Sequence, residues 1–101
     1  MNPAFEHIDQ TKYLLRKLLE SGFLPRQDMS SELRQCEKTA NEFGFSAGGD
    51  MLKQLCDALG ALRAGQGTFG KAALTYSNLV SYYNLVTTML VKEIIVNKKG
   101  T

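Results

Sequence analysis

Apolar residues recur at intervals of three or four positions along most of this chain, and a glycine closes each of the first two such stretches. This spacing gathers side chains on one face of an α-helix, whereas a half-buried strand shows strict alternation. Gly22 and Gly44 stand where a helix commonly ends on a residue in the left-handed conformation. Only two of the 101 residues are proline, which leaves long segments free to be helical. The sequence therefore predicts an all-α fold.

Four helices are expected, over about residues 3–21, 29–43, 47–64 and 68–97. Because the connections between them are short, consecutive helices should pack antiparallel, as in an up-down four-helix bundle, here with a long C-terminal helix. A chain of 101 residues has the length of one ordinary domain. We therefore expect a single helical domain over residues 1–101.

Three features leave details of these helices open. Gly48 and Gly49 weaken the first turn of the third helix, so an alternative start is Asp50, acting as the N-cap. Gly60 lies inside the same helix at a cost of about 1 kcal/mol relative to alanine, and a glycine in such a place often lets another helix approach closely. The β-branched residues 94–96 suit a short strand, but no second strand pattern is present to pair with it, which favours helix.

The charge of the chain argues against a dedicated nucleic-acid binder. Its formal net charge is +2, whereas such binders usually carry a larger basic excess on one face. Basic residues gather only in the first helix and in the tail, and a solvated helix surface is the favoured interpretation of both groups. Nucleic-acid binding is therefore the alternative function, and the residues that would serve it are Lys12, Arg16, Lys17, Lys98 and Lys99.

Residues that usually carry catalysis are few and isolated. His7 is the single histidine, and its neighbour Glu6 points to another face of the helix, so the two do not form an acid–base pair. We expect His7 at the surface. Cys36 and Cys56 lie in or beside apolar seams, away from the helix N-termini that lower a thiol pKa. We expect both to pack as small hydrophobes with free thiols; a disulfide between neighbouring helices is the less favoured alternative.

The sequence offers no pattern for a metal or a cofactor. Zinc sites need ligands in clustered pairs such as Cys-x-x-Cys, and the Glu-x-x-His pairs of di-iron bundles are absent as well. Residues 65–71 look like a phosphate-binding loop only superficially, because the Gly-Lys-Ser/Thr ending and the preceding strand are missing. We therefore expect no catalytic site, no metal and no cofactor.

The fourth helical segment is the most informative part of the chain for function. It carries two adjoining apolar stripes, a wider face than one neighbouring helix needs. Its tyrosines combine aromatic area with hydrogen-bonding groups, a mixture enriched where proteins meet. The leading hypothesis is a small interaction or accessory module that binds a protein partner or forms a homodimer; the alternative places Tyr76 and Tyr83 in the core, with their hydroxyls reaching its edge. The residues proposed for the interaction are Tyr76, Tyr82, Tyr83, Val86, Leu90 and Ile94.

The ends and the apolar stretches of the chain bear on its location. The first residues lack a basic region followed by an apolar run, as a secretory signal would have. The most apolar stretch, residues 79–96, is interrupted by polar and charged residues and does not read as a membrane span. These features, with cysteines expected to be free, are typical of a cytoplasmic protein.

A leucine-rich helical hairpin occupies the middle of the chain, with a glycine between two phenylalanines at its turn. The residues that define it are Leu33, Cys36, Ala40, Phe43-Gly44-Phe45, Ala47, Leu52, Leu55 and Leu59. With the aromatic helix that follows, over roughly residues 31–92, it is similar in pattern to helical segments that accompany bacterial SWIM-type zinc-finger proteins. The Cys-x-Cys and Cys-x-His ligands of such fingers are absent here. The resemblance implies an accessory helical domain that acts beside such a protein, without chemistry of its own.

Overall fold

The computed structural model describes residues 3–24 and 28–99, with side chains up to residue 95. This part of the chain forms four α-helices and contains no strand, which confirms the all-α fold. The helices are α1 (Pro3–Glu20), α2 (Ser30–Glu42), α3 (Ser46–Arg63) and α4 (Phe69–Lys99). Their ends differ from the expected ones by two residues at most, and residues 94–96 belong to α4 rather than to a strand.

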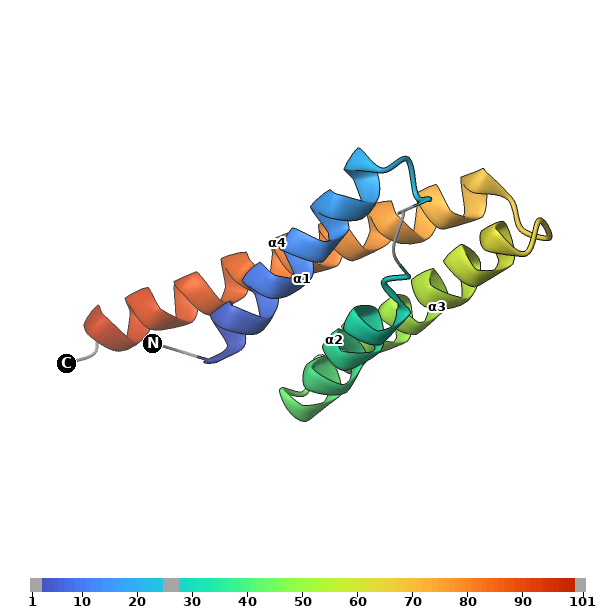
Figure 1. The fold of residues 1–101 in the computed structure, drawn as a ribbon. Helices are drawn as coiled ribbons and strands as arrows, with labels where there is room; N and C mark the ends of the chain where they lie inside the picture. Colours follow the sequence, from blue (N-terminus) through green and yellow to red (C-terminus); the bar gives the residue numbers. More distant parts are fainter. Residues whose placement is uncertain (1–2, 25–27, 100–101) are drawn as a thin grey trace.

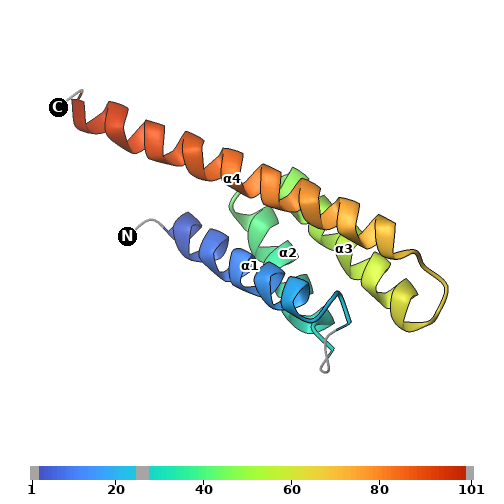
Figure 2. The same ribbon diagram turned by 90° about the horizontal axis from the view of Figure 1, so that it is seen from above.

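The helices run alternately up and down (Figure 1). Each packs on the helix that follows it in sequence, and α4 returns to pack on α1. Because α4 has 31 residues and α1 and α3 have 18 each, α4 continues past the start of α1 (Figure 2). The molecule is therefore elongated, at 56 × 22 × 22 Å. None of the helices described here combines the length and hydropathy that a membrane crossing requires.

Glycine and the apolar residue after it end α1 and α2. At the end of α1, Gly22 has φ +65°, and the Phe23 amide donates to the Leu18 carbonyl over 2.9 Å. At the end of α2, Gly44 has φ +81°, and the Phe45 amide donates to the Ala40 carbonyl over 2.8 Å. Both ends thus use the left-handed stop that the sequence predicts, and each places a phenylalanine ring against the core.

The start of α3 agrees with the expected helix over about residues 47–64 and rules out the alternative start at Asp50. The helix begins at Ser46, so Gly48 and Gly49 lie within its first turns, and both are buried. A Cβ on Gly48 would lie 2.7 Å from Cε2 of Tyr82, and one on Gly49 would lie 2.5 Å from Oδ1 of Asn41. These two glycines therefore provide the close contact with α4 and α2 that we expected at Gly60, where an added Cβ would meet nothing within 4 Å.

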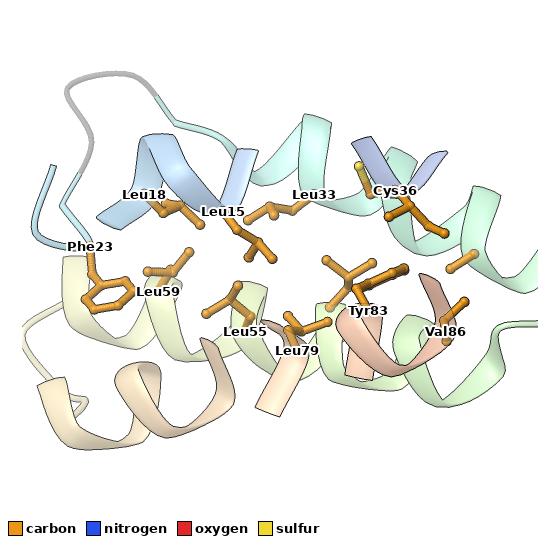
Figure 3. Packing of buried hydrophobic residues seen from close by; sticks show 13 residues of the cluster. Leu15, Leu18, Phe23, Leu33, Cys36, Leu55, Leu59, Leu79, Tyr83 and Val86 are labelled. Carbon is orange, nitrogen blue, oxygen red and sulfur yellow. The ribbon is translucent and has the colours of Figure 1, made fainter. Parts of the chain in front are cut away.

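The hydrophobic core lies along the axis between the four helices (Figure 3). Leucines from all four helices meet there, and Phe23 closes one end by packing edge-on against Phe69 and Tyr76. Tyr83 is the largest fully buried side chain and stands among the leucines near the other end. The labelled core members are Leu15, Leu18, Phe23, Leu33, Cys36, Leu55, Leu59, Leu79, Tyr83 and Val86.

Candidate functional site

Helix α4 divides into a part that belongs to the bundle and a part that leaves it (Figures 1 and 2). Val86 is its last buried side chain and Leu90 its last half-buried one, and all described side chains from 91 to 95 are exposed. We call residues 85–99 the α4 tip. Of the eleven large hydrophobic side chains that are exposed in the described part of the chain, the tip holds five: Leu85, Met89, Val91, Ile94 and Ile95.

Apolar side chains surround the tip rather than forming one stripe. Leu85 and Met89 are 59% and 60% exposed. At 3.6 residues per turn, Met89 and Val91 point about 160° apart. Between residues 85 and 95 the only charges are Lys92 and Glu93. A helix that is hydrophobic on every side is normally enclosed by other helices, so the composition of the tip is that of a covered segment.

The end of the bundle from which the tip projects is acidic. The starts of α1 and α3 and the end of α2 meet there (Figure 1). Residues 3–11 and 40–52 contain no lysine or arginine. They contain four carboxylates, all of them exposed: Glu6, Asp9, Glu42 and Asp50. We call these four residues the acidic end. The tip carries the opposite sign, because Lys92, Lys98 and Lys99 outnumber Glu93.

The residues proposed for interaction from sequence fall into two groups. Tyr83 and Val86 are buried core residues, and Tyr76 and Tyr82 are half-buried against the core. The core alternative describes the positions of Tyr76 and Tyr83, and the structure places Tyr82 and Val86 against or in the core as well. Leu90 is half-buried and Ile94 is 41% exposed, and both belong to the tip.

Leu85, Met89, Val91 and Ile95 are not among the residues that the sequence predicts for the interaction. A usable signal existed, because the fourth helical segment was expected to be much longer than any helix that could cover it.

His7 is buried, so the expectation that it lies at the surface was wrong. It is 3% exposed, and its Nε2 is 2.8 Å from the Tyr83 hydroxyl. The imidazole stacks near the Phe45 ring at a centroid distance of 6.0 Å. The Thr11 hydroxyl donates to the His7 carbonyl over 2.8 Å. Burial lowers the pKa of His7 and raises the pKa of Tyr83 well above its usual range. Because neither group is open to solvent, the pair serves packing rather than reaction with a substrate.

The two cysteines are free and buried, on neighbouring helices. Burial raises the pKa of the Cys36 thiol, which keeps it protonated and makes it a poor nucleophile. Within the described residues, no group of three or more histidine, cysteine, aspartate or glutamate side chains could hold a metal ion.

Two further places on the surface combine opposite charges. A groove of about 470 Å³ between α2 and α3 is lined by Arg34, Lys38 and Lys53 together with Glu37 and Asp57. At the loop of residues 65–71, Thr68 Oγ1 accepts the Lys71 amide over 3.3 Å. That bond is an ordinary helix cap.

The basic residues proposed for nucleic-acid binding do not form one surface. Lys12 is half-buried, Arg16 and Lys17 are exposed on α1, and the Lys17 ammonium lies 4.7 Å above the Tyr13 ring. The α4 backbone places residues 98–99 past the opposite end of α1 (Figures 1 and 2); their side chains lie outside the described part. The two groups are separated along the length of the molecule.

No protein family, no curated protein and no solved structure matches this chain. The similarity to segments that accompany SWIM-type zinc fingers therefore stays a prediction.

Proposed function

We propose that this protein is a non-catalytic helical interaction module whose docking surface is the α4 tip. The observation that carries the proposal is the concentration of exposed apolar side chains on a helix segment that its own bundle covers only at Val86 and Leu90. Burial of one such side chain stabilises an association by roughly 1.5–3 kcal/mol before the costs of binding. Single exposed apolar residues are ordinary, whereas a contiguous cluster marks an interaction site.

The surface area of the chain supports the proposal. The structure exposes 6693 Å², about 1000 Å² more than the roughly 5700 Å² typical of a compact monomer of this mass. The radius of gyration of 14.9 Å likewise exceeds the roughly 13 Å of a compact domain of this length. A stable protein–protein interface takes about 800 Å² from each partner. The excess area is thus large enough for one interface.

Affinity capture from native cells tests the proposal. The variant L85Q/M89Q/I95Q removes apolar surface from the tip while keeping side chains that favour helix. The matched control is L74Q, since Leu74 is 63% exposed on the same helix but lies outside the tip. We expect tagged wild-type protein and L74Q to recover the same partner, and the tip variant to lose it. Equal recovery by all three proteins would refute the tip as the docking surface.

A further inference from the structure

We infer that the occupant of the α4 tip is a second copy of this chain, in an antiparallel dimer. In this dimer, the two tips lie side by side and the basic end of each reaches the acidic end of the other. The inference rests on the proposed function, because it identifies the partner for the same surface. Three observations support it: the charges at the two ends, the length of the tip, and the apolar area available.

The charges favour this arrangement over a parallel one. The end of the tip that carries Lys98 and Lys99 meets the exposed carboxylates on the other copy, and the reverse contact is identical by symmetry. Two parallel tips would bring six lysines together and would also place the two acidic ends side by side. Like charges in juxtaposition oppose association and opposite charges orient it. The charge pattern therefore selects the antiparallel orientation.

The length of the tip fits the same geometry. Its fifteen residues, 85–99, span about 22 Å as α-helix. When two tips overlap fully in opposite directions, the last residues of one lie beside the first residues of the other, where the bundle and its acidic end begin (Figure 2). Because the midpoint of the tip is residue 92, the overlap places Lys92 of one copy opposite Lys92 of the other, with Glu93 of each copy one position away.

The apolar residues of the tip supply the attraction between the copies. Leu85 and Met89 lie on one flank of the helix and Val91 and Ile95 on another. One flank can pack on the partner tip while the other turns toward the end of the partner bundle, where Phe43 is 38% exposed. In such a symmetric contact each copy buries the same apolar residues, so the buried area is twice that of one tip.

A reciprocal charge exchange tests the inference. The tip-reversed variant is K92E/K98E/K99E, and the end-reversed variant is E6K/D9K/E42K. In an antiparallel dimer, either variant alone places like charges at both contacts. An equimolar mixture restores opposite charges at both. Association is measured by sedimentation velocity or light scattering on wild type, on each variant and on the mixture, at low salt and at equal total concentration.

We expect wild type to have twice the chain mass of 11.2 kDa. Each variant alone should associate more weakly by about tenfold or more, and the mixture should recover a one-to-one complex of wild-type strength. Recovery in the mixture also shows that both variants are folded. A mixture that associates no better than its components would overturn the inference. Tighter binding of the tip-reversed variant to wild type than wild type shows to itself would indicate parallel tips and would overturn it as well.

The failure of this inference can be told apart from failure of the proposed function. A wild-type chain that stays monomeric at high concentration, yet captures another protein in a way that depends on Leu85, Met89 and Ile95, would refute the second copy and retain the docking surface. A monomeric chain whose capture does not depend on these residues would refute both.

Discussion

At the residue scale, the bonded pair of His7 and Tyr83 is the most specific polar feature of the core. Each side chain buries a polar atom that would cost free energy without a partner, and the 2.8 Å contact supplies one to both. The phenylalanines that follow the end of α2 enclose the imidazole. The pair therefore joins the first and last helices with a directional contact in a core otherwise made mostly of leucines.

The sequence contains a signal for the burial of His7. Position 7 shares a helix face with Ala4, Thr11 and Leu18, at spacings of three, four and seven, and all of these are buried. A pattern of apolar residues alone leaves out the histidine and the threonine of that face. It would include Leu19, which is 53% exposed in the structure. Only the position of the neighbouring helices decides which flank of a helix is covered.

Removing the Tyr83 hydroxyl should destabilise the fold. In Y83F the ring still fills its space, but the buried His7 Nε2 loses its partner, which costs about 1–3 kcal/mol of unfolding free energy. Urea denaturation compares Y83F with Y82F, a control on the adjacent half-buried ring. An unfolding free energy for Y83F equal to that of Y82F would show that the contact with His7 contributes little.

The stability of the fold should fall in mild acid because of His7. Burial lowers the pKa of His7 in the folded state below its usual value of 6.5, so the unfolded chain takes up a proton first as the pH falls. Stability is therefore at its full value above pH 6.5 and is lost progressively as the pH falls from there through the lower pKa of the folded state. We expect a lower urea midpoint at pH 5.5 than at pH 7.5. The variant H7Q should show a smaller difference between the two values; an unchanged difference would assign the effect to other groups.

At the element scale, local sequence patterns determine the helices, and close backbone approach determines how α3 packs. The four helical segments could be predicted because their apolar spacing and their glycine stops are local features. The role of the glycines inside α3 could not, because it depends on which residue of another helix lies opposite. Gly48 faces Tyr82 and Gly49 faces Asn41, whereas Gly60 faces open space. From helix propensity alone, each of the three glycines is expected to destabilise the helix.

Alanine substitutions at two glycines of α3 should have opposite effects. In G60A the new methyl group meets nothing, so the better helix propensity of alanine should raise stability by about 0.5–1 kcal/mol. In G48A the methyl group would lie 2.7 Å from the Tyr82 ring and 3.0 Å from the Tyr83 hydroxyl. The resulting strain of about 1–3 kcal/mol should exceed the gain in propensity and lower stability. Thermal denaturation of the two variants beside wild type measures both effects, and a stabilised G48A would contradict the close packing of α3 on α4.

At the scale of the whole molecule, the unequal lengths of the helices create the candidate interaction surface. The partners that flank α4 are 18 residues long, so a helix of 31 residues must leave part of its length outside the bundle. The sequence indicates this through the expected lengths. The sequence does not indicate which apolar residues of α4 stay exposed, because leucine and isoleucine are common both in cores and in interfaces. Only the packed bundle shows that Tyr83 is buried and Met89 is exposed.

Hydrogen exchange of backbone amides should report on the tip as the protein is diluted. In a monomer, amides beyond Leu90 belong to a helix whose described side chains are exposed, so they should exchange quickly through local opening. In a dimer the same amides are covered, so their protection should rise with concentration. Amides around Leu55 in the core, which exchange by global unfolding, should also gain protection, because dimerisation stabilises the folded state. We expect the tip variant L85Q/M89Q/I95Q to exchange quickly at every concentration and L74Q to follow wild type. Concentration-dependent protection in the core without any in the tip would place the interface on another face of the bundle.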